Sequence, residues 1–252
     1  GRPGADSGMD RNPRMPAPLA ANGRLFHQGM NRLVALDAYN GAILWSLEIP
    51  AMQRVNLPRD AGNWCADDTS LYVAIRERCW MIGHSDGGLQ RVFDLPEGFS
   101  RDMHDWGYVA RKDNTLLGSV VKRNTSYTDF WGDYAWYDKT SGAGTEKVCS
   151  DALFAYDLPT GQLMWAWHNG LVINTTIAVG RQSVFFVESR NLSLKGAAAR
   201  RLNDPLLWSD QHLVCLNAQT GEPLWDTPID TADGIVVLYL ACTDNAIVIV
   251  SS

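Results

Sequence analysis

The sequence has few cysteines, no excess of basic charge and no long apolar run. Five cysteines in 252 residues are too few and too scattered for a disulfide scaffold, and neither Cys-x-x-Cys nor Cys-Cys occurs. Lysine and arginine number 22 against 28 aspartate and glutamate, and the net charge of −6 leaves no basic footprint, so we expect no nucleic-acid partner. The longest apolar stretches, such as 235–242, are far shorter than the roughly 20 residues that cross a bilayer. We therefore expect no transmembrane segment.

The apolar residues follow strand rather than helix periods. Apolar residues make up 46% of the chain and aromatic residues 10%, which is a globular composition and not a disordered one. Short β-type runs occur at 24–28, 70–75, 115–121, 183–188 and 245–250, and no segment of comparable length has helical periodicity. The sequence therefore predicts an all-β fold.

One phrase of sequence recurs along the chain. Its clear copies span 33–45, 153–165 and 213–225, and each has an apolar strand, an Asp or Asn, a turn that ends in Gly, and a Trp four residues later. A degraded copy at 79–91 ends in Arg91 instead of Trp. Gly supplies the positive φ that such turns require, and Asp or Asn accepts hydrogen bonds from backbone N–H groups two residues ahead. We interpret each copy as two antiparallel strands joined by a tight turn.

The spacing of the copies indicates the architecture. The turn glycines stand at 41, 87, 161 and 221, which are 46, 74 and 60 residues apart. Each copy also has further β-type runs ahead of it. A unit of this length with these runs matches a propeller blade of four antiparallel strands. We label the strands of a blade A to D from the inside outwards. The predicted domains are an extended, Pro- and Gly-rich segment at 1–21 and propeller blades over 22–252.

The recurring phrase resembles the tryptophan-docking motif of the PQQ-like, quinoprotein-type β-propeller repeats. The resemblance implies a structural docking role for the matching residues, which are Ala35, Asp37, Gly41 and Trp45, then Ala155, Asp157, Gly161 and Trp165, and, with two mild departures, Cys215, Asn217, Gly221 and Trp225. The small residue before the turn is expected to leave room for an indole from the neighbouring blade. Family propellers usually have seven or eight blades, whereas the copies here account for about four to five. We expect an incomplete arc whose remaining blades are its first partners.

Two long insertions are expected on one face of the propeller. The B–C hairpins at 26–34 and 73–81 are tight, whereas those at 121–153 and 188–213 are expanded. Loops that grow on one face of a rigid scaffold commonly carry function. The first insertion, 122–150, supplies aromatic and acidic candidates for stacking on a sugar or planar ligand: Trp131, Asp133, Tyr134, Trp136 and Tyr137. These rings could instead cap the blade edge, and Arg201 in the second insertion is either a solvated loop residue or an anion contact.

The residues that open the A strands should face the central channel from that same side. They are Asn63-Trp64, Asp105-Trp106 and Asn174-Thr175, of which Trp64, Asp105 and Trp106 are the ligand candidates. Asp and Asn are also ordinary turn residues. No nucleophile is marked beside His104, so no catalytic residue and no metal ligand is assigned.

Three functions remain open. The preferred one is a non-catalytic binding or scaffold propeller that contacts a protein or glycan with its insertion face and has no cofactor. It resembles the periplasmic propellers that assist outer-membrane protein assembly, which implies a periplasmic or other extracytoplasmic location. The alternative is part of a PQQ- and calcium-dependent alcohol or sugar dehydrogenase, although the adjacent cysteines usual in that group are absent from this chain. The third is a glycan-processing or glycan-binding propeller.

Overall fold

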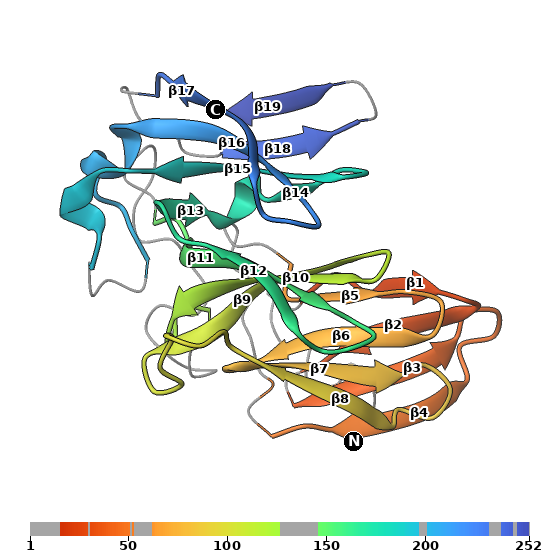
Figure 1. The fold of residues 1–252 in the computed structure, drawn as a ribbon. Coiled ribbons are helices and arrows are strands. Elements are labelled where there is room, and N and C mark those ends of the chain that lie inside the picture. Colours follow the sequence, from red (N-terminus) through yellow and green to blue (C-terminus); the bar gives the residue numbers. More distant parts are fainter. Residues whose placement is uncertain are drawn as a thin grey trace.

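The computed structural model describes residues 16–29, 31–50, 52, 62–126, 146–196, 201–231, 238–243 and 246–251. Within these ranges the chain is built almost entirely of antiparallel strands (Figure 1). Blade 1 consists of β1 (Leu19–Ala21), β2 (Arg24–Gln28), β3 (Arg32–Asp37) and β4 (Ile43–Glu48). Blade 2 consists of β5 (Trp64–Ala66), β6 (Ser70–Ile75), β7 (Arg78–Gly83) and β8 (Leu89–Asp94).

Two further blades and a hairpin follow. Blade 3 consists of β9 (His104–Lys112), β10 (Thr115–Lys122), β11 (Cys149–Asp157) and β12 (Leu163–Trp167). Blade 4 has a split inner strand, β13 (Leu171–Ile173) and β14 (Ala178–Val179), followed by β15 (Ser183–Ser189), β16 (Gln211–Asn217) and β17 (Pro223–Ile229). The last pair is β18 (Leu238–Cys242) and β19 (Ile247–Ser251). The predicted all-β propeller is confirmed, and the described sheets do not close into a ring.

Blades 3 and 4 share one continuous sheet, which the repeat pattern did not predict. Cys149 and Ser150 of β11 pair with Ile173 and Val172 of β13, and β13 also pairs with β15. The short 3-10 helix η2 (Asn174–Thr176) separates β13 from β14, so the inner strand of blade 4 can lean onto its neighbour. Among the described residues no helix is both long and apolar enough to span a bilayer.

The hydrophobic core lies between successive blades rather than inside any one of them. Phe26 of blade 1 packs with Leu71 of blade 2, and Tyr72 of blade 2 packs in one cluster with Trp106 of blade 3. Blades 3 and 4 share a cluster that includes Trp165. A single small sheet has two apolar faces and no core of its own, so burial against the next sheet is what stabilises it.

The four turns of the repeat have one geometry. The glycines at 41, 87, 161 and 221 all have φ between +70° and +74°. In the first turn the Asp37 carboxylate accepts the backbone N–H of Tyr39 at 2.8 Å, and in the fourth the Asn217 side-chain oxygen accepts that of Gln219 at 2.8 Å. Asn can replace Asp in this turn because the hydrogen bond to the backbone N–H needs only a side-chain oxygen as acceptor.

A side chain from the outer strand of each of blades 1, 2 and 3 crosses to the turn of the next blade. The Trp45 indole N–H donates to the His84 carbonyl at 2.7 Å, and the Trp165 N–H donates to the Ala218 carbonyl at 2.9 Å. Between blades 2 and 3 the Arg91 guanidinium donates to the carbonyl of Leu158, the equivalent turn position, and to that of Pro159 at 3.2 Å. The copy that looked degraded in sequence therefore keeps the contact with a different side chain.

The room for each crossing side chain comes from the turn glycine. A Cβ atom on Gly87 would lie 2.9 Å from the Trp45 ring, and one on Gly221 would lie 2.5 Å from the Trp165 ring. Ala155 pairs with Trp165 across the strands of its own blade and is buried in the cluster shared by blades 3 and 4. Only glycine combines a positive φ with so close an approach.

Candidate functional site

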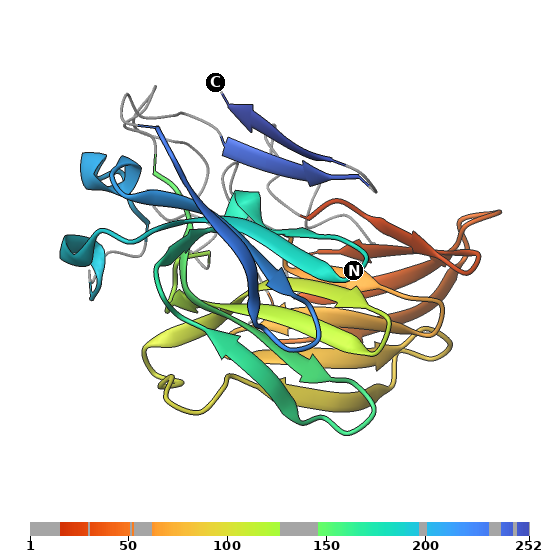
Figure 2. The same ribbon diagram turned by 45° about the horizontal axis from the view of Figure 1, so that its top comes forward.

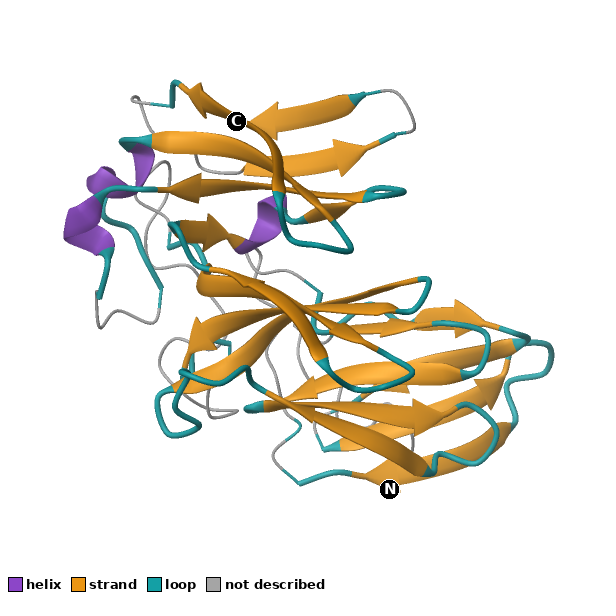
Figure 3. Cartoon of the chain, in the orientation of Figure 1, coloured by secondary structure: helices purple, strands orange, loops and turns teal. Residues whose placement is uncertain are grey.

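The two long insertions meet on one side of the molecule, where Figure 3 shows two of the short helices beside blade 4. We call this surface the insertion platform and define it as 123–126 and 146–148 from blade 3 with 190–196 and 201–210 from blade 4. The first part joins β10 to β11 and the second joins β15 to β16. Both therefore leave the same end of their strands.

Local capping explains the shape of the second insertion. It contains η3 (Leu192–Leu194) and η4 (Pro205–Trp208), and a side-chain oxygen caps the start of each. Asn191 accepts the backbone N–H of Ser193 at 2.9 Å, and Asp204 accepts that of Leu206 at 2.9 Å. These are the residue types that N-cap positions favour.

The two insertions are joined by backbone as well as side-chain contacts. Lys147 donates its N–H to the Leu202 carbonyl at 2.7 Å, and Leu202 donates back to the Lys147 carbonyl at 3.0 Å. The Lys147 ammonium lies 5.0 Å from the centre of the buried Trp208 ring. Arg201 donates to the Thr125 carbonyl at 3.1 Å and lies 3.5 Å from the Glu146 carboxylate. The structure therefore uses Arg201 to connect the insertions.

The platform combines a buried base with apolar groups on its surface. Leu194, Leu202 and Leu207 are buried in a cluster beneath the loops. Leu192 is 77% exposed and Leu206 is 43% exposed on top of them. Loops on a rigid scaffold commonly carry binding residues, so the platform is a candidate contact surface.

Some of the predicted ligand contacts cannot be placed. Trp131, Asp133, Tyr134, Trp136 and Tyr137 lie outside the described residues. Their predicted contact with a ligand stays a prediction. The described ends of their insertion, Ser126 and Glu146, belong to the platform.

Trp64 and Trp106, which the sequence places at the channel, are core residues in the structure. Trp64 is 6% exposed and donates its indole N–H to the Ala17 carbonyl at 3.2 Å. Trp106 is fully buried, lies edge-on to Phe154 and donates to the Tyr108 carbonyl at 3.0 Å. Both rings are covered because they begin inner strands that pack between blades, so neither presents a face to a ligand here.

The polar residues beside them are buried and engaged. The Asp105 carboxylate accepts the Asn124 backbone N–H at 2.6 Å and lies 3.9 Å from the Arg76 guanidinium. Asn63 donates its amide to the Gln28 side-chain oxygen at 3.2 Å. In the third of the predicted strand openings, the Asn174 side-chain oxygen accepts a hydrogen bond from the Ser150 hydroxyl at 2.5 Å.

These residues do not complete a calcium site by themselves. Calcium takes six to eight oxygen ligands, and one oxygen of the Asp105 carboxylate and the Asn174 side-chain oxygen already accept hydrogen bonds within the fold. In the part of the chain that the structure describes, no three His, Cys, Asp or Glu side chains converge as metal ligands would. We therefore derive no step through a metal or a quinone from these residues.

A second polar network lies beside the platform on blade 4. The fully buried Glu188 carboxylate accepts the Trp167 indole N–H at 2.9 Å and the Arg190 Nε–H at 2.8 Å. Arg190 also bonds Asp226, whose other oxygen lies 2.6 Å from His212 Nδ1. Burial raises the pKa of Asp226, but hydrogen bonds from His212 and Arg190 outweigh burial and hold that pKa below its usual value.

Both histidines that lie near strand starts on this side are occupied. His212 faces Asp226 with Nδ1 and Asp210 with Nε2, at 2.6 and 3.4 Å. His104 Nδ1 lies 3.1 Å from the Ser100 carbonyl, and its Nε2 lies 3.6 Å from Asp151. Each ring therefore has a neighbour on both of its nitrogens.

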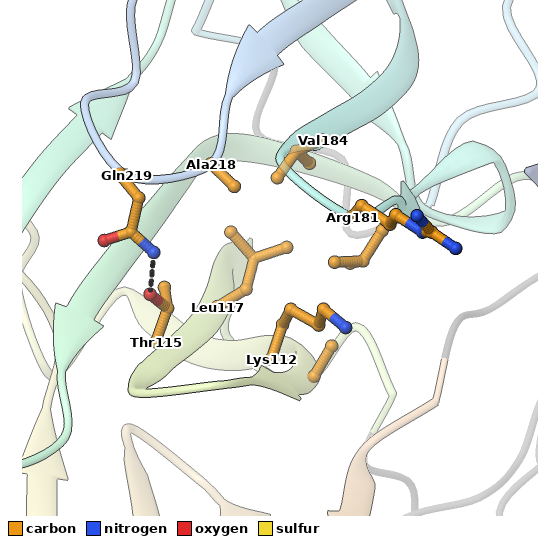
Figure 4. Close-up of a pocket in the computed structure, with 9 residues that line it drawn as sticks. Lys112, Thr115, Leu117, Arg181, Val184, Ala218 and Gln219 are labelled. Carbon is orange, nitrogen blue, oxygen red and sulfur yellow. Dashed lines mark hydrogen bonds between the residues drawn. The ribbon is translucent and has the colours of Figure 1, made fainter. Parts of the chain in front are cut away.

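A small pocket opens between blades 3 and 4 on the side of the repeat turns (Figure 4). Leu117, Val184 and Ala218 line its apolar part, and Lys112 and Arg181 lie at its rim. Its volume of about 20 Å³ holds about one water molecule, so no planar cofactor fits inside.

Sequence reasoning missed several of these residues. Lys147, Glu188 and Arg190 are single charged residues in loops or strand ends, and nothing local marks them. Arg91 did carry a signal, since it stands at the repeat position of the tryptophans.

Comparison with known proteins supports the fold alone. No family model and no curated protein sequence matches the chain. Among solved structures it resembles the quinohemoprotein alcohol dehydrogenase of Comamonas testosteroni, with a TM-score of 0.57 and 12% identity over 89% of this chain and 37% of that one. The Neurospora crassa Pan2 WD40 domain matches with a TM-score of 0.50 and 10% identity, over 90% of this chain and 55% of that one. BamB from Moraxella catarrhalis matches with a TM-score of 0.47 and 14% identity, over 91% and 67%.

The chain thus spans well under half the length of the dehydrogenase and just over half of the Pan2 chain. The similar structures with a TM-score of 0.50 or more include an alcohol dehydrogenase and a WD40 domain, so the likeness supports the propeller fold.

Proposed function

We propose that this chain is a non-catalytic binding and scaffold segment of a PQQ-like propeller, and that the insertion platform contacts its partner. The proposal rests on the hydrogen bonds that connect the two insertions, between Lys147 and Leu202 and from Arg201 to Thr125. Two loops from adjacent blades that are bonded to each other form one surface rather than two independent tails. The ionisable groups near the platform form ion pairs with one another, which favours a binding role over a catalytic one.

The assignment to the PQQ-like repeat class rests on the contacts between blades. An indole or guanidinium donates to the same turn carbonyl in three successive junctions, over a glycine that leaves room for it. We propose that these are the docking contacts of that class. The periplasmic or other extracytoplasmic location, and a protein or glycan as the partner, are parts of the same proposal.

A comparison of two faces tests the binding role. Three proteins are compared: the wild-type chain, the Leu206→Ser variant, and the double variant Trp131→Ala with Trp136→Ala. Each is tested for binding to protein extracts and to a glycan array. Leu163→Ser is the matched control, because Leu163 is 42% exposed against 43% for Leu206 and starts β12 at the repeat-turn end. We expect a ligand whose binding falls about tenfold in the platform variants and not in the control. Equal loss in all variants, or none in any, contradicts the proposal.

The dehydrogenase alternative is favoured by one observation, the buried Asp105 carboxylate at an inner strand start. If it held, PQQ and calcium would supply the redox chemistry, and residues beyond the described ranges would have to complete the ion's shell. The test adds PQQ and Ca²⁺ to the purified chain and measures quinone absorbance after gel filtration, then dye reduction with an alcohol or a sugar. Retained quinone and activity that Asp105→Ala abolishes would replace our proposal.

A further inference from the structure

The pocket between blades 3 and 4 has an apolar base and a cationic rim. Its lining comes from the β9–β10, β14–β15 and β16–β17 hairpins, whose turns Figure 2 shows on one side of the molecule. Leu117, Val184 and Ala218 form the base (Figure 4). Lys112 and Arg181 lie at the rim, and the described lining residues include no carboxylate. Such a lining suits a ligand that is apolar at one end and anionic at the other.

The strand register identifies the same place in the junction between blades 2 and 3. Leu117 is the third residue of β10, and Tyr72 is the third residue of β6. Lys112 pairs with the first residue of β10, and the Asp67 N–H donates to the carbonyl of the first residue of β6 at 3.0 Å. Lys112 therefore stands where the preceding junction has Asp67, so the charge at this position is reversed.

Two further positions of the pocket correspond in the same way. Val179 pairs with the second residue of β15, and Arg111 pairs with the second residue of β10. Val179 therefore replaces Arg111. Ala218 directly follows the last residue of β16, and Leu158 directly follows the last residue of β11. Ala218 therefore replaces Leu158, and the pocket has the smaller side chain at both positions.

Larger side chains and an internal carboxylate occupy the junction of blades 2 and 3. Tyr72 is 1% exposed, and its hydroxyl donates to the Asp67 carboxylate at 2.9 Å. The Arg111 Nε lies 3.2 Å from the same carboxylate. That junction therefore supplies its own anion, held between a hydroxyl and a guanidinium.

The junction of blades 1 and 2 is filled by two rings. Phe26 is the third residue of β2, and His84 directly follows β7. The centres of these two rings lie 4.6 Å apart. Leu117 and Ala218 are smaller than the residues at the same positions of both other junctions. A smaller side chain at a packed position leaves a space, which explains why the pocket opens here.

We propose that this pocket binds a small aliphatic carboxylate, whose methyl end lies between Leu117 and Ala218 and whose carboxylate pairs with Lys112. The bound carboxylate supplies the negative charge that Asp67 supplies in the preceding junction. The volume of about 20 Å³ admits a group about the size of a water molecule, which a methyl group approaches. The pocket lies on the side of the repeat turns, so the proposal does not depend on the insertion platform.

Two sources present this chemistry. A free short-chain acid such as propionate and the C-terminal alanine of a peptide both carry a methyl group one carbon away from a carboxylate. The probes are therefore sodium propionate and acetylglycylalanine. Their controls are propionamide and the amidated dipeptide, which keep the methyl group and lack the charge.

Methyl NMR spectra of the chain, recorded during titration with each probe, test the site. Lys112→Gln removes the cation, and the exposed position of Lys112 allows this variant to fold, which circular dichroism checks. Arg78→Gln is the matched control, because it removes one positive charge from β7 in blade 2. Ala218→Leu copies Leu158 of the preceding junction and should fill the pocket.

We expect saturable shifts of the Leu117 and Val184 methyl signals with Kd on the order of 1–10 mM, since so small a ligand makes few contacts. Lys112→Gln should raise Kd about fivefold, and Arg78→Gln should leave it unchanged. The neutral controls and Ala218→Leu should abolish the shifts.

The relative affinity of the two probes identifies the source. Tighter binding of acetylglycylalanine assigns the site to a peptide C-terminus, and tighter binding of propionate assigns it to a free acid. The proposal is overturned by the absence of shifts up to about 50 mM of both probes, by equal binding of the neutral controls, or by an unchanged Kd in Lys112→Gln.

Discussion

Replacing the turn glycines by alanine separates the strain of the turn from the packing of the indole. Gly41 and Gly221 have φ of +73° and +70° in equivalent turns, so alanine meets the same backbone strain at both, about 1–2 kcal/mol. A Cβ atom on Gly41 meets nothing within 4 Å, whereas one on Gly221 lies 2.5 Å from the Trp165 ring. Only the second substitution must displace an indole.

The extra cost follows from what Trp165 loses. Its ring is 7% exposed and its N–H donates to the Ala218 carbonyl at 2.9 Å. Losing that hydrogen bond costs about 1 kcal/mol, and forcing the overpacked ring aside costs about 1–3 kcal/mol. We expect Gly221→Ala to lower the free energy of unfolding by about 3–6 kcal/mol and Gly41→Ala by about 1–2 kcal/mol.

Urea denaturation followed by circular dichroism measures the difference, provided that the slope m is the same in both variants. Gly161→Ala serves as an intermediate case, because the group 3.2 Å from its Cβ is the flexible Arg91 guanidinium. Equal destabilisation by Gly41→Ala and Gly221→Ala would refute the view that the glycine is required by the crossing indole.

Three further predictions concern single side chains between or within the blades. Burial lowers the pKa of His84, so the unfolded chain takes up the proton first, and stability should fall as pH drops below about 6.5, by at most about 1.4 kcal/mol per pH unit. His84→Leu, which places the residue of the equivalent position 158 in this turn, should reduce the fall in melting temperature below pH 6.5. An unchanged slope of melting temperature against pH would contradict the role of His84. Arg91→Ala should lower the free energy of unfolding in urea by about 1–2 kcal/mol, because its contacts with the turn carbonyls are lost, whereas Arg91→Trp should retain stability. Equal free energies of unfolding for the two variants would contradict this prediction. Burial raises the pKa of the Cys149 thiol to about 12, so in the native chain at pH 8 Cys149 should resist a disulfide reagent that labels the partly exposed Cys242, as mass spectrometry of the labelled peptides would show.

The blades and their turns could be predicted from the sequence because their causes are local. Alternating apolar residues form strands that are buried on their faces, and the Asp-to-Gly phrase specifies its turn through one acceptor oxygen and one positive φ. The spacing of that phrase predicted about four to five blades, of which the structure describes four and a further hairpin, and the long gaps between strands located both insertions.

Contacts between distant residues could not be predicted in this way. Arg91 looked like the loss of a motif until the fold placed it against Leu158, 67 residues away. Trp106 looked like a channel residue until the packing of blades 2 and 3 enclosed it. A repeat pattern records which residue types recur, but it does not record which neighbour covers each one.

By itself, then, the sequence determined the small sheets, their order and the turns that join them, since each depends on residues a few positions apart. The tertiary structure alone decided that Lys147 bonds Leu202, that Asn124 donates to the Asp105 carboxylate, and that Trp165 donates to the Ala218 carbonyl. These outcomes depend on how neighbouring sheets are placed against each other. That placement is set by burial summed over whole faces, which no single stretch of sequence encodes.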